Sequence, residues 1–364
     1  MYRPVEGRRG WYNAPEVDAT LKAIVKTQAA TGAELKDVPT PETPRNGALV
    51  KIKNVSICGT DFHVYSWDAW AQSRVKPPVT MGHEWAGEVV EVGPECASLK
   101  VGDYVSGESH HVCGHCLQCR TGQGHVCQNT KIFGVDTTGC FAEYFAVPEA
   151  SVIKNDPRVP PHIACMQDPL GNAVHAALAG DITGKSVAVL GCGPIGLFAI
   201  AVCRAVGSST IFASDTTDYR LKLACEVGAD HVTKVPEEDI EQTVAEATGG
   251  QGVDVVLEMS GAAPAIQQAM RLARPGGRVS LMGIPSRDVT LALAEDVIFK
   301  GLTVQGIVGR RLYDTWYTMK ALLASGRLDV SPILTHRMAF EEFAAGMDLM
   351  RSGQCGKVVL HVSD

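Results

Sequence analysis

Four cysteines stand within one short segment of the chain and could together hold a metal ion. Thiolates at this spacing can complete a tetrahedral zinc site that has no open position, which is the structural type of zinc site. An iron–sulfur cluster is the alternative, because four cysteines also hold iron. The fourth cysteine lacks the following proline of bacterial ferredoxins, and the sequence has no second cluster motif. A structural zinc is therefore predicted at Cys113, Cys116, Cys119 and Cys127.

A more dispersed group of metal-ligating residues lies upstream of these cysteines. It consists of Cys58 in Cys-Gly-Thr-Asp-Phe-His and of His83 and Glu84 in Gly-His-Glu. One thiolate, one imidazole and one carboxylate, with a fourth position left for water or substrate, form the pattern of a catalytic zinc. A cysteine and a histidine 25 residues apart would usually be unrelated, so this hypothesis depends on the other motifs of the chain.

A third motif is typical of dinucleotide binding. The apolar segment 187–190 enters Gly191-x-Gly193-x-x-Gly196, and a helical pattern follows. The glycines allow a tight turn, room for the pyrophosphate and close contact between helix and strand, while the helix N-terminus attracts the phosphates. Asp215 follows Gly196 at the end of the next predicted strand, where its carboxylate would bind the ribose hydroxyls and repel a 2′-phosphate. NAD is therefore favoured over NADP, although Arg220 could pair with such a phosphate.

Composition and charge exclude several classes of protein. The chain has 364 residues, 45% of them hydrophobic and 20% charged, which is the balance of a globular protein with room for two domains. Its net charge of −7 argues against nucleic acid or an anionic membrane as a partner. The segment 187–206 is long and apolar, but its glycines and proline favour a buried strand, turn and helix over a membrane span. The first residues are no secretory signal, and most of the twelve cysteines are scattered singly, so we expect a reducing cytoplasm.

The elements that must position these residues change in type near Asp168. Residues 21–147 are mostly β, with segments such as 49–55 and 85–92 between turn signals. Strands and helices then alternate, which predicts a doubly wound parallel sheet. The chain becomes helical at 312–325 and ends in a strand at 357–362, which we expect to return to the first domain. The strands expected in the alternating region are 186–190, 210–214, 253–258, 278–283 and 303–307, and its first two helices are 195–206 and 219–227.

This order of motifs resembles the zinc-containing medium-chain dehydrogenases, from about Leu21 to the C-terminus. The resemblance implies an α/β fold with a β-rich GroES-like catalytic domain plus a doubly wound Rossmann domain. Residues 1–20 would form an N-terminal arm. Residues 21–167 and 309–364 would form the zinc-containing domain, and residues 168–308 the NAD-binding domain. Trp85 departs from the family, which usually has tyrosine or phenylalanine after the glutamate.

The resemblance also implies roles for single residues. Cys58, His83 and Glu84 would bind the catalytic zinc, and the four-cysteine segment would bind the structural one. Thr60 and His63 would relay the proton, although His63 without its motif reads as an ordinary surface histidine. Asp168 would support proton transfer near the zinc. The implied NAD contacts are Gly191, Gly193, Ile195, Gly196, Asp215, Arg220, Met282, Gly283, Ile284, Ile307 and Val308.

Within that superfamily the chain is most similar to the branch that acts on L-threonine. The resembling segments include 57–70, 168–175, 258–261, 297–301, 306–310 and 350–357. The implied reaction is NAD-dependent oxidation of the L-threonine β-hydroxyl to 2-amino-3-oxobutanoate, with polyols or 2,3-butanediol as the alternative substrates. His110 and Arg310 are candidates for holding the amino acid, but a solvated surface arginine is an equal reading of Arg310.

Two interpretations from outside this group of enzymes stay open beside this one. A zinc-stabilised module that binds nucleic acid could use the four cysteines, but the negative charge and the intact nucleotide motif argue against it. A zincless reductase of the same fold would have no need for Cys58, His83 and Glu84 together. Relatives of this kind are commonly homotetramers, so the resemblance implies a homo-oligomer.

Overall fold

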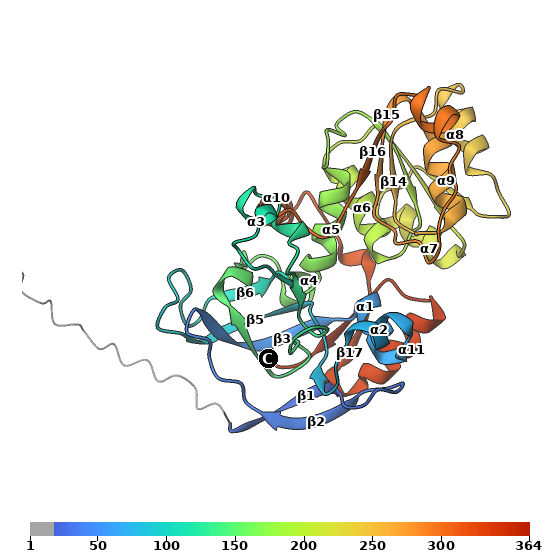
Figure 1. Ribbon diagram of the computed structural model, residues 1–364. Coiled ribbons are helices and arrows are strands. Elements are labelled where there is room, and N and C mark those ends of the chain that lie inside the picture. Colours follow the sequence, from blue (N-terminus) through green and yellow to red (C-terminus); the bar gives the residue numbers. More distant parts are fainter. Residues whose placement is uncertain (1–17) are drawn as a thin grey trace, which may run out of the picture.

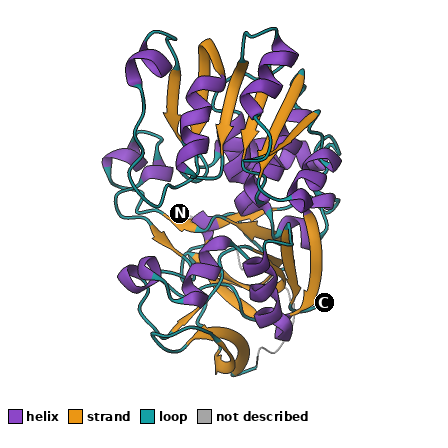
Figure 2. Ribbon diagram, turned by 90° about the vertical axis from the view of Figure 1, so that its right-hand side faces the viewer, coloured by secondary structure: helices purple, strands orange, loops and turns teal. Residues whose placement is uncertain are grey.

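The computed structural model describes residues 18–364, which form a β-rich part and an α/β part (Figure 1). Residues 1–17 of the predicted N-terminal arm lie outside the described residues, and strand β1 (Thr20–Lys26) begins at the last residue assigned to that arm. The two parts are distinct when the molecule is turned by 90° (Figure 2). Among the described residues, no helix has the length and apolar character needed to cross a membrane.

The β-rich part is built on a mostly antiparallel sheet. Its central strands are buried along most of their length, and strand β3 has β5, β9 and β18 as its partners. A second sheet has the order β2–β1–β4, and β7 pairs with β8 beside the four-cysteine segment. The strands of this part are β2 (Glu34–Pro39), β3 (Gly47–Ser56), β4 (Val79–Thr80), β5 (Trp85–Val92), β6 (Tyr104–Gly107), β7 (His110–His111), β8 (Lys131–Ile132), β9 (Tyr144–Pro148), β10 (Val152–Lys154), β17 (Leu334–Ala339) and β18 (Lys357–His361).

The α/β part confirms the predicted doubly wound parallel sheet. Its six strands have the order β13–β12–β11–β14–β15–β16, and every neighbouring pair is parallel. The strand order reverses between β11 and β14, and ligands of such sheets bind in the crevice at this point. The strands are β11 (Ser186–Leu190), β12 (Thr210–Asp215), β13 (His231–Lys234), β14 (Val253–Glu258), β15 (Ala273–Leu281) and β16 (Thr303–Gly306).

Helices cover both faces of the parallel sheet and connect the two parts. Helix α5 is buried along almost its whole length and packs against α6 and α10. The helices are α1 (Gly59–Ser66), α2 (Ala69–Arg74), α3 (Leu117–Arg120), α4 (Pro161–Ala164), α5 (Gln167–Ala177), α6 (Pro194–Ala205), α7 (Asp218–Glu226), α8 (Ile240–Thr248), α9 (Ala263–Leu272), α10 (Asp314–Ala324) and α11 (Phe343–Ser352). Shorter turns are η1 (Gly124–Val126), η2 (Glu149–Ser151), η3 (Ala294–Ile298), η4 (Ser331–Ile333) and η5 (Phe340–Glu342).

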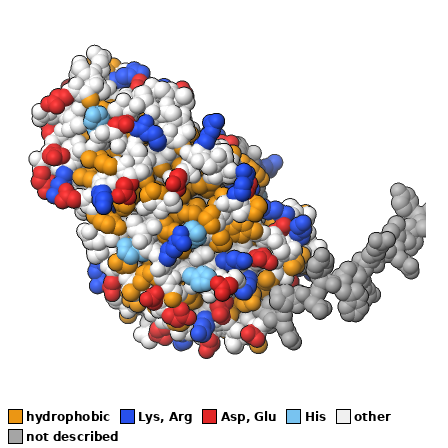
Figure 3. Space-filling model, turned by 180° about the vertical axis from the view of Figure 1, so that it is seen from behind, with side chains coloured by type: hydrophobic (Ala, Val, Ile, Leu, Met, Phe, Trp, Pro, Cys, Tyr) orange, Lys and Arg blue, Asp and Glu red, His pale blue; other side chains and the backbone are white. Residues whose placement is uncertain are grey.

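One buried cluster joins the two parts of the molecule. It contains Ala86 and Ile153 from the β-rich part, Val187 and Phe198 from the α/β part, and Trp316 from α10. Seen from behind, apolar side chains also gather in a band across the middle of the surface, where the parts meet (Figure 3). The shared core also contains Cys192, which follows β11, so residues near the carboxyl end of a parallel strand pack in the same cluster as Ala86 of β5.

Candidate active site

The structure brings together the three dispersed residues that were predicted to share a metal. One ligating atom each of Cys58, His83 and Glu84 lies within 4.8 Å of the others. Cys58 is the residue before α1, while His83 and Glu84 directly precede β5, a neighbour of the strand that leads to Cys58. Pairing of β3 with β5 therefore brings Cys58 close to His83, although the two residues are 25 positions apart in the sequence.

The donor atoms fit a zinc ion. Glu84 is fully buried, and its Oε1 atom has no hydrogen-bond partner, although its Oε2 atom accepts from Lys357 Nζ and the Ser56 hydroxyl. A buried carboxylate oxygen without a partner is costly unless a cation satisfies it. Thiolate, imidazole and carboxylate ligands with one further position open match a catalytic zinc site.

Asp61 is a further residue of this site, which the sequence reasoning missed. Its carboxylate accepts from the Cys58 backbone N–H at 2.9 Å and lies 3.5 Å from His83 Nδ1, an atom with no hydrogen bond. Burial raises the pKa of Asp61 to about 6, against the opposing effect of His83. Burial disfavours the charged His83 ring, but Asp61 and Cys58 outweigh it and raise the pKa of His83 to about 10. A carboxylate beside a ligating histidine orients its ring in many metal sites, and the spacing Cys-x-x-Asp was the available signal.

Helix α1 carries the two residues of the predicted proton relay. Thr60 and His63 are three residues apart and so share one face of this helix. His63 is 54% exposed, and its Nδ1 atom lies 2.5 Å from an Asp68 carboxylate oxygen. Asp68 also accepts from the Ala71 backbone N–H at the start of α2, so the position of its carboxylate is fixed from two sides. The helix thus runs from the metal-ligating cysteine to a solvent-exposed histidine.

Asp168 lies in a buried ionic network near the metal ligands. Its carboxylate oxygens lie 3.0 and 3.1 Å from the Arg310 guanidinium, and one of them accepts from the Ser109 backbone N–H. Burial raises the pKa of Asp168, and Arg310 opposes this effect. Glu108, a residue that the sequence analysis did not single out, binds the other side of Arg310 and accepts from Trp316 Nε1 at 2.8 Å. Arg310 is thus held between two buried carboxylates.

The reading of Arg310 as a solvated surface residue is wrong, because the side chain is only 1% exposed. Its five guanidinium N–H groups are directed at Glu108, Asp168 and neighbouring acceptors, among them Asn172 Oδ1 at 2.8 Å and Ser109 Oγ at 2.8 Å. A substrate carboxylate would have to displace one of these acceptors. His110 is half-buried, with Nδ1 3.0 Å from Arg310.

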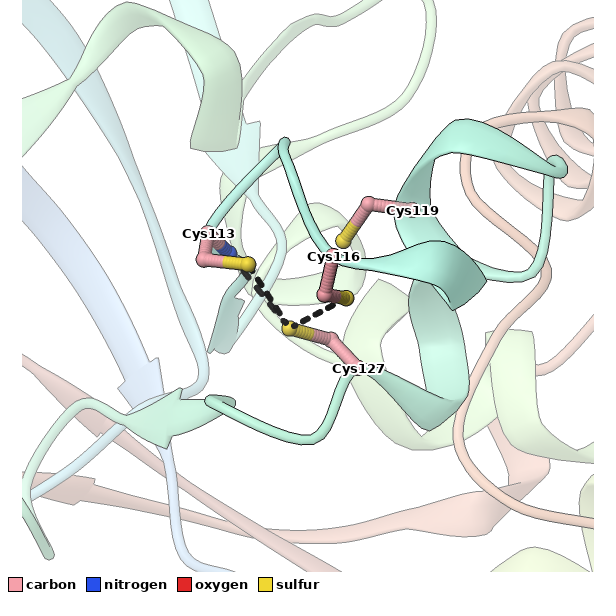
Figure 4. Close-up of side chains that lie close together, drawn as sticks. All are labelled: Cys113, Cys116, Cys119 and Cys127. Atoms are coloured by element: carbon pink, nitrogen blue, oxygen red, sulfur yellow. Dashed lines mark hydrogen bonds between the residues drawn. The ribbon is translucent and has the colours of Figure 1, made fainter.

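The four predicted structural ligands also converge (Figure 4). Their sulfur atoms all lie within 4.8 Å of one another, with separations of 3.5 Å between Cys113 and Cys127 and 3.7 Å between Cys116 and Cys127. Tetrahedral zinc with bonds of about 2.3 Å to sulfur requires sulfur separations of roughly 3.8 Å, so the site fits this metal. The side-chain amide of Asn129 and backbone N–H groups lower the pKa of Cys113 to about 5, which favours the thiolate that zinc needs.

The predicted dinucleotide motif forms the turn between β11 and α6. Gly191 has φ of +94°, and a Cβ atom on it would lie 2.8 Å from Ser260. A Cβ on Gly196 would lie 1.9 Å from the Gly191 carbonyl oxygen, whereas one on Gly193 would meet nothing within 4 Å. These contacts agree with the expected roles: the first and third glycines allow close packing, and the second leaves open space where a pyrophosphate would pass.

The remaining predicted cofactor residues surround this turn. The Asp215 carboxylate accepts from the Cys192 and Thr217 backbone N–H groups, and Arg220 Nη1 lies 3.9 Å from it. Arg220 therefore lies beside Asp215, and the acidic side chain that would repel a 2′-phosphate is still present at the turn. Ile195 is the second residue of α6 and is half-buried. Met282 and Gly283 follow β15, and both donate backbone N–H groups to the Glu258 carbonyl oxygen. Beyond them, Ile284 is 90% exposed, Ile307 is buried and Val308 is exposed.

Comparison with protein-family models agrees with both parts. Residues 44–160 match the alcohol dehydrogenase GroES-like domain, and residues 194–325 match the zinc-binding dehydrogenase family. The predicted fold class is thereby confirmed. The first match contains all seven predicted metal ligands, and the second contains Asp215 and Arg220.

Solved structures with this architecture include several dehydrogenases. An alcohol dehydrogenase from Thermus sp. ATN1 has a TM-score of 0.86 and 33% identity, covering 94% of this chain and 100% of that chain. The 2R,3R-butanediol dehydrogenase of Bacillus subtilis has a TM-score of 0.85 and 27% identity, with the same coverage. An alcohol dehydrogenase from Escherichia coli CFT073 in complex with NADH has a TM-score of 0.87 and 27% identity, covering 95% and 100%.

Curated relatives are more similar in sequence. L-threonine 3-dehydrogenase of Pyrococcus abyssi is 53% identical over 93% of this chain and 98% of its own length. The enzyme of the same name from Bacillus licheniformis is 49% identical over 94% and 99%. Agreement at this level over nearly the full length of both proteins identifies the family. The chain belongs to the zinc-binding dehydrogenases and, among them, to the family of the L-threonine 3-dehydrogenases.

Proposed function

We propose that this protein oxidises the β-hydroxyl of L-threonine with NAD and releases 2-amino-3-oxobutanoate. The observation that carries the proposal is the identity of about half of all residues with L-threonine 3-dehydrogenases over nearly the whole chain. The butanediol dehydrogenase of the same fold is much less similar, at 27% identity. The substrate of the relatives is therefore the better choice for this chain.

The proposed metal ligands are Cys58, His83 and Glu84, and the four-cysteine segment would hold a second, structural zinc. Zinc in the first site would act as a Lewis acid that lowers the pKa of a bound hydroxyl. The chain itself provides two buried carboxylates, Asp61 beside His83 and Asp168 beside Arg310. Asp168 is the carboxylate proposed to support proton transfer near the zinc.

The proton would leave through helix α1. Thr60 is half-buried and His63 is exposed, and the Asp68 carboxylate holds the His63 imidazole. An imidazole can both accept and donate a proton, so His63 is suited to pass the proton to solvent. His110 and Arg310 stay proposed as residues near the amino acid, with Arg310 acting through the carboxylates that it binds.

NAD is the proposed cofactor. One structural relative was solved with NADH and another with NADP, so the fold alone does not select between them. Asp215 is 6% exposed and its carboxylate lies at the glycine turn, where it would repel a 2′-phosphate. The proposed contacts are those of the sequence analysis, from Gly191 to Val308, and the proposed NAD-binding domain spans residues 168–308.

We further propose that the protein is a cytoplasmic homo-oligomer, and by resemblance a homotetramer. All twelve cysteines are free thiols, and five of them are proposed metal ligands. Thiols persist in a reducing compartment such as the cytoplasm. Strand β16 is an edge strand, and exposed Ile298, Phe299 and Val304 lie on or just before it. An unpaired edge with exposed apolar side chains favours association with another copy. Light scattering on the purified protein measures the mass of the assembly.

The substrate assignment is tested by a comparison of alcohols. Purified protein with measured zinc content is incubated with NAD and L-threonine, sorbitol or 2,3-butanediol, and NADH formation is followed. We expect kcat/KM for L-threonine to exceed the others by at least about 100-fold, because a site built for polar groups of one substrate rejects analogues that lack them. A preference for sorbitol or butanediol would refute the proposal.

A further inference from the structure

A buried lysine lies directly behind one of the proposed metal ligands. Lys357 is 2% exposed, and its ammonium nitrogen lies 2.5 Å from Glu84 Oε2 and 2.7 Å from the Ile57 carbonyl oxygen. Burial of an ammonium is costly, so such a lysine is kept where its charge is paired and its donors are used. The partner is a carboxylate that also faces the metal site, which makes Lys357 part of the surroundings of the metal.

The two oxygen atoms of Glu84 have different surroundings. Oε2 accepts hydrogen bonds from Lys357 and from the Ser56 hydroxyl, whereas Oε1 is buried without a partner. Oε1 is the atom left for a metal. The two oxygens thus differ: one is held by the protein, and the other is left free to bind an ion.

The strand order explains how a residue 273 positions away reaches Glu84. Lys357 is the first residue of β18, which pairs antiparallel with β3, and the Ile57 N–H donates to the Val358 carbonyl oxygen beyond the end of β3. The same β3 strand leads into Cys58. The C-terminal strand therefore delivers a positive charge to the point where the proposed ligands Cys58 and Glu84 come together.

We infer that Lys357 is a positioning residue that restricts Glu84 to binding the catalytic metal through one oxygen atom. Holding Oε2 prevents the carboxylate from chelating the ion with both oxygens, and the nearby ammonium repels the cation. Both effects weaken the hold of Glu84 on the metal and leave more positive charge on the ion for the substrate hydroxyl. The inference rests on the proposed metal site at Cys58, His83 and Glu84.

Replacement of the ammonium tests this role. The substitution Lys357→Met keeps a long, unbranched side chain but removes its positive charge and all three N–H donors. We expect the catalytic site to bind zinc at least about tenfold more tightly in chelator competition, and its cadmium NMR resonance to move. The four-sulfur site gives a separate resonance, which must stay in place and serves as an internal reference. Unchanged or weaker zinc binding with an unmoved resonance would overturn the inference.

Three further variants separate positioning from a merely structural role. Lys357→Arg keeps the charge and should bind zinc within about twofold of the wild type. Ser56→Ala removes the other hydrogen-bond donor to Glu84 Oε2 and should shift the cadmium resonance of the catalytic site in the same direction as Lys357→Met. If Lys357→Met does not fold, this variant tests whether holding Oε2 affects the metal. Lys26→Met removes an equally buried lysine that bonds only to backbone carbonyls, Gly32 and Tyr65 among them, and should leave the resonance unmoved. If the wild type gave only the four-sulfur resonance, the metal site itself would be refuted and the inference with it.

Discussion

His83 and Glu84 each keep one buried polar atom without a hydrogen-bond partner. An unsatisfied buried group costs about 1–3 kcal/mol, so two of them within one cluster of ligands would be a considerable loss for a protein without a ligand there. Cys58, His83 and Glu84 could be picked out by residue type in the sequence, but not their contact. Asp61 lies three residues after Cys58 and is positioned locally by the first turn of α1. Lys357, in contrast, is brought to Glu84 by pairing of distant strands, which no local pattern reveals.

A substitution at His63 tests the proposed proton relay. His63→Ala should lower kcat by about 100-fold or more, because a positioned acid–base group contributes roughly that factor. Zinc content should stay at the wild-type value, since His63 is not among the clustered metal ligands. Turnover and metal content are measured on the same preparation.

His361→Ala is the matched control, because this histidine is 55% exposed and lies at the end of β18. Its turnover should be that of the wild type. Loss of zinc from the His63 variant would mean that His63 is a metal ligand and not a relay residue.

The turn η2 carries a carboxylate whose hydrogen bonds contribute to stability, and this contribution depends on pH. The Glu149 carboxylate, in η2, accepts from the Ala97 and Ser98 backbone N–H groups and from the Ser98 hydroxyl. The Ser98 hydroxyl and these N–H groups lower the pKa of Glu149 to about 2. The carboxylate is ionised above its unfolded pKa of about 4.5, so its contribution to stability is complete there and is lost as the pH falls toward 2.

Glu149→Gln should therefore lower the free energy of unfolding by on the order of 1 kcal/mol at pH 7. The difference from the wild type should shrink as the pH falls below 4.5, which urea denaturation at several pH values measures. A difference that grows in acid would contradict the assigned hydrogen bonds.

The four-cysteine segment is an element stabilised by its proposed metal. Cys116→Ser should lower the thermal midpoint or prevent assembly before it affects chemistry, because a structural zinc contributes to folding. Thermal unfolding and the activity of the folded fraction are compared. Normal stability with lost turnover would contradict the structural role.

Local patterns predicted most elements of the α/β part correctly. The strands at β11 and β14 were predicted at their observed bounds, because apolar runs between glycine turns mark buried parallel strands. β15 begins at Ala273, five residues before its predicted start, and this extra stretch pairs with β14 through Ala273 and Val253, ahead of a shift in register. β13 of this part and β17 of the β-rich part were missed because their residues are mostly exposed or only partly buried, so no apolar run marks them. The dinucleotide motif was local and was found, whereas the network of Glu108, Asp168 and Arg310 joins three distant segments.

For the molecule as a whole, hydride transfer requires that the metal ligands of the β-rich part and the dinucleotide site of the α/β part act on one substrate. The shared core contains Cys192 of the glycine turn and Ala86 of β5, two residues after Glu84, so both sites border the junction of the two parts. The central claim is that a hydride passes from the β-carbon of L-threonine to NAD across this junction.

Deuterium labelling tests that claim most directly. L-threonine carrying deuterium on its β-carbon is incubated with NAD and the zinc-loaded protein, and the reduced cofactor is analysed by mass spectrometry. We expect NADH that carries one deuterium per turnover, formed together with 2-amino-3-oxobutanoate. Unlabelled NADH, or no reduction of NAD by L-threonine, would contradict it.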